Sequence, residues 1–194
     1  MGVEDKHMET ESFKTAIEAA RKGEHGAFRE LFDASSDKVF RYLLGQLGDR
    51  NDALDMLQDI YIDLWKGLPR FRYRSDQEFW GFVFLIARRK VYAHRKGADR
   101  RHIAVDNETL EILHDQSSPQ ELHSDDHGPL ALALRRLSAT SREVLNLRYW
   151  SELSFKEIAL ATSTTEGAAK VRHHRALKEL QTHLPSGYVE QQFI

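Results

Sequence analysis

The stretch LSATSREVLNLRYWSELSFKEIALATSTTEGAAKVRHHRALKEL, residues 137–180, decides the fold of the C-terminal part of the chain. Ser154 is followed three residues later by Glu157, which is the spacing of a helix-starting capping box. The four hydroxyl residues at 162–165 favour helix caps over continued helix, so the first helix should end there. One of their side chains can cap a second helix that begins at Glu166. Two helices joined by three or four residues predict a helix-turn-helix.

The second predicted helix has a basic side and an apolar side. Its apolar residues recur at spacings of three and four, so they share one face, and the cations lie opposite. The basic residues are Lys170, Arg172, His174, Arg175 and Lys178. Cations on such a helix suit a major groove lined by phosphates and base acceptors. On spacing alone, an ordinary solvated amphipathic helix remains an alternative.

The whole stretch resembles region 4 of bacterial sigma factors. The matching residues are Leu137, Arg142 to Leu145, Leu147 to Tyr149, Leu153, Ser154, Glu157 to Ala159, Glu166, Gly167, Lys170, Arg172, Arg175, Ala176 and Leu180. The resemblance implies that the second helix reads the minus-thirty-five promoter element. The residues that would do so are Thr165, Glu166, Lys170, Arg172, His174 and Arg175.

Some positions in this stretch depart from the sigma pattern. Glu152 and Ser163 stand where glycine is usual, so a positive φ at Glu152 would cost about 1 kcal/mol. His173 stands at an aliphatic position, and we expect it to pack under the helix rather than contact a base.

Helices are expected over residues 11–23, 27–34 and 37–47 of the N-terminal part, with Gly48 ending the third. Residues 49–65 predict another helix whose outer side is acidic. An acidic face is often merely solvated, and it cannot bind DNA. The order of its residues, however, resembles sigma region 2.2, which in the family docks on the largest RNA polymerase subunit. The matching residues are Asp52, Ala53, Asp55, Gln58, Asp59, Tyr61 and Trp65, of which Asp52, Asp55, Gln58 and Asp59 are the predicted polymerase contacts.

In the loop at residues 68–76, arginines alternate with aromatic residues. Guanidinium groups hold phosphates and rings stack on unpaired bases, so this pattern suits single-stranded DNA. An edge strand with its aromatics inward is the alternative. The helix expected over 77–96 resembles sigma regions 2.3 and 2.4, with departures at Phe82, Arg89 and Ala93 that affect which minus-ten element is read. The predicted minus-ten contacts are Arg70, Phe71, Arg72, Tyr73, Arg74, Trp80, Arg88, Arg89 and Arg95.

Residues 101–136 contain seven acidic and three basic residues, together with serine, proline and glycine, and are typical of a flexible linker. As free coil, about 25 residues span roughly 25 to 30 Å. Two DNA elements two helical turns apart are separated by roughly 70 Å. Simultaneous contact therefore requires an almost extended linker, and we hypothesise that the polymerase holds it so. The expected domains are residues 11–100, linker 101–128 and residues 129–184, with a disordered or expression-derived segment at 1–10 and a tail at 185–194.

Composition narrows the function classes. The net charge is −2, so any nucleic-acid surface must be local, and the absence of cysteine excludes disulfides and thiolate chemistry. There is no apolar run that spans a bilayer, so we expect a cytoplasmic protein with no membrane contact of its own. The ten histidines show no metal-site spacing. His123, Asp125, Asp126 and His127 form only a weak cluster in the linker. We expect no enzyme activity, catalytic residue, metal or cofactor.

Together these features predict an all-α protein with two small helical domains, and it resembles an extracytoplasmic-function (group 4) sigma factor. The resemblance implies a transcription initiation factor whose partners are core RNA polymerase, promoter DNA and an anti-sigma factor. One alternative is a sigma-like decoy that binds an anti-sigma factor without touching DNA. Another, a free helix-turn-helix repressor, leaves the N-terminal part unexplained.

Overall fold

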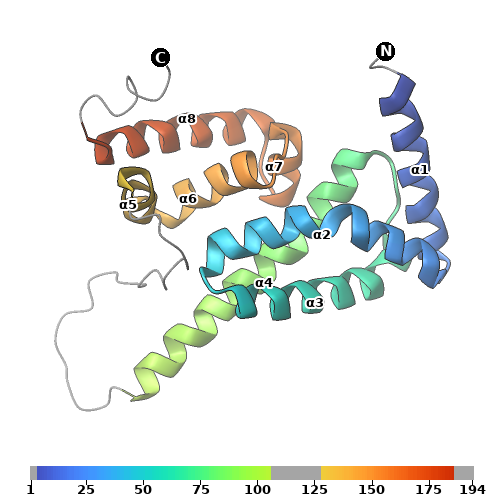
Figure 1. Cartoon of the computed structure of the whole chain (residues 1–194), viewed down its shortest axis with the longest axis horizontal. Helices are drawn as coiled ribbons and strands as arrows, with labels where there is room; N and C mark the ends of the chain where they lie inside the picture. Colours follow the sequence, from blue (N-terminus) through green and yellow to red (C-terminus); the bar gives the residue numbers. More distant parts are fainter. Residues whose placement is uncertain (1–3, 106–127, 186–194) are drawn as a thin grey trace.

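The computed structural model describes residues 4–105 and 128–185, and these residues contain helices but no strand, as expected of an all-α protein (Figure 1). The elements are α1 (Glu4–Arg21), α2 (His25–Leu47), α3 (Arg50–Gly67), the 3₁₀ turn η1 (Leu68–Arg70), α4 (Asp76–Val105), α5 (Pro129–Arg136), α6 (Ala139–Leu145), the π-helical turn η2 (Asn146–Trp150), α7 (Phe155–Ala161) and α8 (Glu166–His183). We call α1–α4 the N-terminal half and α5–α8 the C-terminal half.

The N-terminal half is a bundle whose helices each bury an apolar stripe. Its fully buried large side chains are Ile17, Leu31, Tyr42, Leu43, Ile60, Leu64, Leu68, Phe79 and Phe84. Each aliphatic or aromatic side chain of this size contributes about 1.5 to 3 kcal/mol when it is removed from water. Aromatic rings extend this core, for example where Phe13 of α1 meets Phe79 of α4 edge to face at 5.2 Å.

One helix replaces the two that were predicted over 27–34 and 37–47. The prediction left residues 35 and 36 between two helices, but α2 continues through them. Ser35 is fully buried in α2, where its hydroxyl bonds the carbonyl of Leu31 and the hydroxyl of Tyr61. Because both bonds satisfy the buried hydroxyl, this serine does not end the helix. Gly48 does end it, in the left-handed conformation with φ 78°.

Two other helix boundaries differ from the prediction. The first helix begins at Glu4 rather than Glu11, so residues 4–10, which were expected to be disordered or expression-derived, are helical. The fourth extends to Val105 rather than Lys96, past the predicted start of the linker at residue 101. The remainder of the predicted linker, including the weak histidine–aspartate cluster, and nearly all of the C-terminal tail lie outside the described residues.

The helix-turn-helix forms as its caps predict. The backbone N–H of Glu157 donates to Ser154 Oγ at 3.3 Å, and Glu157 Oε2 accepts from the backbone N–H of Ser154 at 2.6 Å, completing the capping box. Thr165 Oγ1 accepts from the N–H of Ala168 at 3.2 Å and caps α8. Glu152 and Ser163, at the two positions where glycine is usual, have φ values of 56° and 51°. Both carry the backbone cost expected for a side chain in that region.

The two halves lie side by side and share one continuous apolar core (Figure 1). The most extensive contact between elements of different halves joins α4 to α7, and η2 packs on α2. Within the C-terminal half, α8 lies across α5, α6 and α7. This arrangement decides which of the predicted site residues face solvent.

Candidate nucleic-acid and polymerase interfaces

The predicted DNA-reading side of α8 is exposed to solvent. Lys170, Arg172, His174 and Arg175 are all exposed, whereas Ala169 and Ala176 on the opposite side are buried against the rest of the C-terminal half. In the described part of the chain, Arg172 and Arg175 form no ion pair. These two guanidinium groups are therefore available to an anion from outside the protein.

Lys170 is held in place by its neighbours. Its ammonium lies 2.7 Å from Glu166 one turn earlier, and 6.0 Å from the centre of the Phe155 ring. The bond from Lys170 and its charge lower the pKa of the Glu166 carboxyl. Glu166 also lies in the first turn of α8, where the helix dipole favours a negative charge. Glu166 and Lys170 thus form a surface pair beside the two free arginines.

His173 packs under α8, as its sequence position suggested. Its ring meets Phe155 edge to face at 5.2 Å, and its Nε2 lies 3.2 Å from the hydroxyl of Tyr149. Burial, followed by the charges of Arg148 and His174, lowers the pKa of the imidazole. The neutral ring therefore belongs to the packing between α8 and the helices that support it.

The four predicted polymerase contacts, Asp52, Asp55, Gln58 and Asp59, are all exposed on α3. The opposite side of α3 buries Ala53, Met56 and Ile60 in the core. Lys90 of α4 approaches this acidic face, 3.6 Å from Asp59 and 2.9 Å from Asp63, and these carboxylates raise its pKa. Asp52 and Asp55 form no ion pair within the described residues.

The basic-aromatic loop, residues 68–76, separates its two kinds of side chain. Arg70, Arg72 and Arg74 are exposed, while Phe71 and Tyr73 turn inward. Phe71 stacks on Phe82 with ring centres 5.0 Å apart. The Tyr73 hydroxyl donates to Asp76 at 2.7 Å, and burial together with that carboxylate raises the pKa of Tyr73 to about 12. The edge-strand alternative is wrong, because this loop begins as a 3₁₀ turn and contains no strand. The aromatic side chains nevertheless face inward, as that alternative expected.

The predicted minus-ten residues of α4 are not equally accessible. Arg89 is exposed. The Trp80 ring stacks on Phe13 at 5.9 Å, and the Lys38 ammonium lies over it at 4.7 Å. Arg95 donates to the backbone carbonyl of Gln46 at 2.9 Å and to its side chain at 2.7 Å. Arg88 bonds Glu143 of the C-terminal half. Of the predicted minus-ten residues, only Arg89 and the three loop arginines are therefore cations without a partner in the described part of the chain.

Tyr92 of α4 was not among the predicted site residues, although it is strongly exposed beside cations. This residue is 69% exposed, more than any other large hydrophobic residue in the described part of the chain. It lies on α4 three residues after Arg89 and four before Lys96, so the three share one face of the helix. The signal was present in the sequence as an aromatic residue between two cations at helical spacing.

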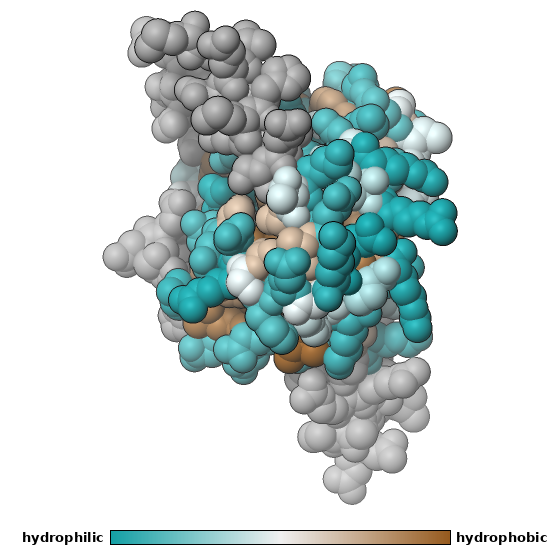
Figure 2. Space-filling model, turned by 90° about the vertical axis from the view of Figure 1, so that its right-hand side faces the viewer, coloured by the Kyte–Doolittle hydropathy of each residue, from teal (hydrophilic) through white to brown (hydrophobic). Residues whose placement is uncertain are grey.

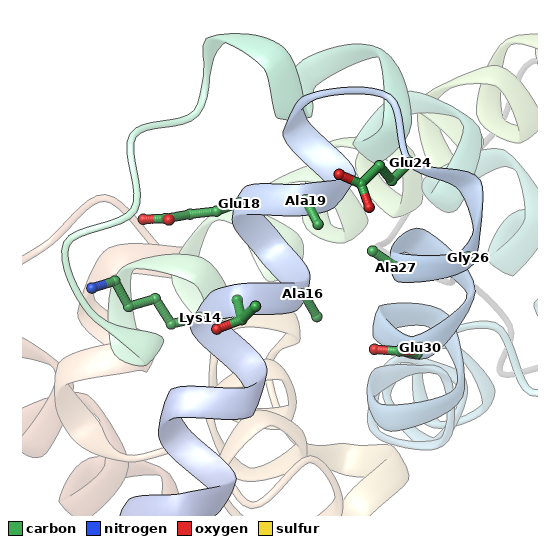
Figure 3. Close-up of a pocket in the computed structure, with 9 residues that line it drawn as sticks. Lys14, Ala16, Glu18, Ala19, Glu24, Gly26, Ala27 and Glu30 are labelled. Carbon is green, nitrogen blue, oxygen red and sulfur yellow. The ribbon is translucent and has the colours of Figure 1, made fainter.

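The groove drawn in Figure 3 is a poor candidate for the functional site. It has a volume of about 610 Å³ and lies between α1 and α2, with alanines of the two helices facing each other and Glu24 and Glu30 beside them. None of the predicted site residues lines it. Within the described residues there is no cluster of metal-ligating side chains. The face of the molecule that bears α1 is mainly hydrophilic, with scattered hydrophobic patches (Figure 2).

None of the described helices is both long and apolar enough to cross a membrane.

Comparisons with known proteins agree with this geometry. Residues 31–101 match the family model "Sigma-70 region 2", which includes α3, the basic-aromatic loop and most of α4. Residues 127–180 match "Sigma-70, region 4", which includes the helix-turn-helix. Among solved structures, CnrH in complex with the cytosolic domain of CnrY has a similar fold, with a TM-score of 0.63 and 21% identity over 88% of this chain and 96% of that one. RpoE from Bartonella quintana, solved with the anti-sigma factor NepR, gives a TM-score of 0.62 and 23% identity over 80% of this chain and 95% of that one.

Relatives found by sequence identify the class. The ECF RNA polymerase sigma factor BldN of Streptomyces coelicolor is 31% identical over 87% of this chain, which spans 64% of that relative's length. The ECF RNA polymerase sigma factor SigD of Mycobacterium tuberculosis is 33% identical over 90% of this chain and 84% of its own length. The chain therefore belongs to the ECF sigma factors of RNA polymerase.

Proposed function

We propose that this chain is a transcription initiation factor that binds core RNA polymerase and directs it to specific promoters. One observation carries the proposal: an exposed acidic face on α3 and an exposed cationic helix on a helix-turn-helix belong to different halves of one chain. Of these two surfaces only the second suits DNA, so the two surfaces have different partners. The similarity to proteins named ECF RNA polymerase sigma factors supports a function together with RNA polymerase.

The roles divide by residue as follows. Asp52, Asp55, Gln58 and Asp59 dock on the polymerase. Thr165, Glu166, Lys170, Arg172, His174 and Arg175 contact the minus-thirty-five element. Arg70, Phe71, Arg72, Tyr73, Arg74, Trp80, Arg88, Arg89 and Arg95 bind and open the minus-ten element. In this last set the inward-turned rings and the engaged arginines must change partners before they touch DNA, because bonds within the protein occupy them.

The domain division at residues 11–100, 101–128 and 129–184 remains part of the proposal, with α4 continuing to Val105. An anti-sigma factor is a further proposed partner, because a protein of similar fold was solved with one. A transcription factor of this class works where the polymerase and the DNA are, in the bacterial cytoplasm. No observation favours the decoy alternative, and the exposed cations of α8 would serve no purpose in it.

The test is assembly followed by transcription. The purified chain is mixed with core RNA polymerase and passed over a sizing column, and the same fractions transcribe a genomic promoter library. Comigration, with start sites preceded by two spaced sequence motifs, is the expected result. Failure to comigrate would overturn the proposal.

A further inference from the structure

The basic-aromatic loop is fixed to the N-terminal half at both of its ends. Leu68 in η1, where the loop begins, is fully buried, and η1 packs against α1 and α3. At the other end, the Ser75 hydroxyl oxygen accepts from the backbone N–H of Glu78 at 3.3 Å and caps α4. The shape of the loop between these ends is therefore set by what its inward side chains contact.

Phe71 holds the first half of the loop through apolar packing. Its ring stacks on that of Phe82 with ring centres 5.0 Å apart, and it meets Phe79 edge to face at 6.0 Å. Gly67 at the end of α3 makes room for this stack, because a Cβ there would lie 3.0 Å from the tip of the Phe82 ring. An outward turn of Phe71 would break both ring contacts and uncover Phe82.

The second half of the loop is held by a single polar bond. The half-buried Tyr73 donates its hydroxyl to Oδ1 of Asp76, the first residue of α4, at 2.7 Å. Within the described residues this is the only side-chain hydrogen bond that residues 70–74 form. A hydrogen bond to a carboxylate is roughly twice as strong as one between neutral groups. We call the Tyr73–Asp76 bond the loop anchor.

The loop anchor decides which way the loop arginines face. Tyr73 lies between Arg72 and Arg74, and successive side chains of an extended chain point to opposite sides. Because the anchor turns Tyr73 inward, its two neighbours are turned outward, where both are exposed and form no ion pair within the described residues. Alternate residues of an extended chain are about 6.6 Å apart. The loop thus presents a row of guanidinium groups that suits the backbone of a single DNA strand.

Two carboxylates lie beside the inward ring of Tyr73. Burial raises the pKa of Tyr73, and so do the bond and charge of Asp76 and the charge of Glu18 on α1. If Tyr73 turned outward to stack on a base, Asp76 would lose its hydrogen-bond donor. A DNA phosphate at the loop would then approach a carboxylate with no partner, and like charges repel. The inward position of Tyr73 is therefore the one that suits a bound DNA backbone.

We propose that Tyr73 is a positioning residue: the loop anchor holds Arg72 and Arg74 in the outward arrangement that binds the backbone of single-stranded minus-ten DNA, and the ring of Tyr73 stays inward when the DNA binds. The DNA part of this proposal rests on the proposed function, whereas the anchor itself does not. A loop without the anchor must be ordered at the moment of binding, and this ordering weakens the affinity for DNA. The alternative is a ring that turns outward and stacks on a base, which requires the anchor to break.

The first measurement tests the loop anchor in the free, full-length chain. Trypsin cleaves after arginine, so the rate of cleavage after Arg72 and Arg74, divided by the rate for the same variant in its unfolded form, reports how often the loop opens. Tyr73→Phe removes the hydroxyl and keeps the ring, Asp76→Ala removes the acceptor, and Asp76→Asn keeps an oxygen that can accept. We expect Tyr73→Phe and Asp76→Ala each to raise the cleavage rate about tenfold, and Asp76→Asn to stay near wild type. The double variant of Tyr73→Phe with Asp76→Ala should be cleaved no faster than Asp76→Ala alone, because the bond is already absent.

Tyr149→Phe is the matched control. It also removes a tyrosine hydroxyl that has a polar partner, His173 Nε2 at 3.2 Å, but it does so in the C-terminal half. The cleavage rate in the loop should be the same in this variant as in wild type. An unchanged rate in Tyr73→Phe, or an equal increase in the control, would refute the loop anchor.

The second measurement tests what the anchor does for DNA binding. Polymerase assembled with each variant binds a single-stranded oligonucleotide that carries the minus-ten motif from the transcription assay, at several salt concentrations. We expect Tyr73→Phe to weaken binding about tenfold without changing the slope of log affinity against log salt, because no phosphate contact is lost. Arg72→Ala should reduce that slope by about 0.7, the value for one phosphate contact of a single strand. Asp76→Asn should bind at least as tightly as wild type, since it keeps the anchor and removes a negative charge.

The other outcomes separate the possible errors. Faster cleavage of Tyr73→Phe with wild-type DNA binding would overturn the positioning role and leave the anchor as a purely structural bond. Wild-type binding by Tyr73→Phe with weaker binding by Tyr73→Leu would show that the ring stacks on a base. A reduced salt slope in Tyr73→Phe would also overturn the proposal. Failure of the chain to assemble with polymerase would refute the proposed function and with it the DNA role of Tyr73, while the cleavage rates would still decide whether the anchor exists.

Discussion

Replacing Arg172 and Arg175 with alanine should weaken promoter binding by the assembled polymerase and reduce its dependence on salt. Both side chains are exposed on α8 and form no ion pair in the described part of the chain. Their loss therefore breaks no contact that holds the fold. The substitutions should act on DNA binding alone, since alanine also favours helix.

The magnitude follows from counterion release. Each phosphate contact adds about 0.9 to the slope of log affinity against log salt, so two lost contacts reduce the slope by about 1.8. At about 0.1 M salt one such contact contributes about 1.2 kcal/mol, and two contribute about 2.4 kcal/mol, which is about 60-fold in affinity. Lys170 remains in the variant, tied to Glu166, so some of the slope persists.

The assay titrates promoter DNA with polymerase assembled around each variant, at several salt concentrations. The control replaces Lys22 and Arg29, two exposed cations of the N-terminal half outside every proposed surface, with alanine. It removes the same charge and should leave the slope unchanged. An unchanged slope in the α8 variant, or an equal decrease in the control, would refute the assignment of α8 to DNA. Loss of assembly with polymerase would show that the binding surfaces are wrongly placed.

Three other changes test separate parts of the structure. Asp55→Lys should weaken binding to core polymerase at least about tenfold, because it places a cation on the proposed docking face, whereas the same change on α2, Asp33→Lys, should not weaken it. Equal affinities of the two variants would show that α3 is not the docking face. His173→Leu should reduce the loss of thermal stability between pH 7.5 and 5.5, because burial lowers the pKa of this imidazole and the folded protein, which prefers it neutral, loses stability as the pH falls below the ordinary pKa of 6.5. An equal loss in wild type, in His173→Leu and in the exposed neighbour variant His174→Leu would contradict this. Ser154→Ala should lower the free energy of unfolding by about 1 kcal/mol, since it removes one of the two bonds of the capping box, while Thr140→Ala at an exposed position of α6 should change it by no more than about 0.5 kcal/mol. Equal changes in the two variants would show that the cap does not stabilise α7.

Features that depend on neighbours in the chain could be predicted. The caps of α7 at Ser154 and of α8 at Thr165 follow from side chains that bond the backbone three residues away. The exposed acids of α3 follow from helical periodicity, which also identified its buried side. The split of α2 was wrong because Ser35 is stabilised by Tyr61, which lies 26 residues later on another helix.

The sequence by itself therefore determined the caps of α7 and α8, the helix-turn-helix and the sign of charge on each surface, because these depend on interactions within one or two turns. Only the tertiary structure decided which predicted DNA contacts are free. Arg88 meets Glu143 across 55 residues, and Asn146 meets Tyr42 across 104. No local pattern encodes such pairs, since they exist only when the two halves close on each other through Gly45 and Gly81.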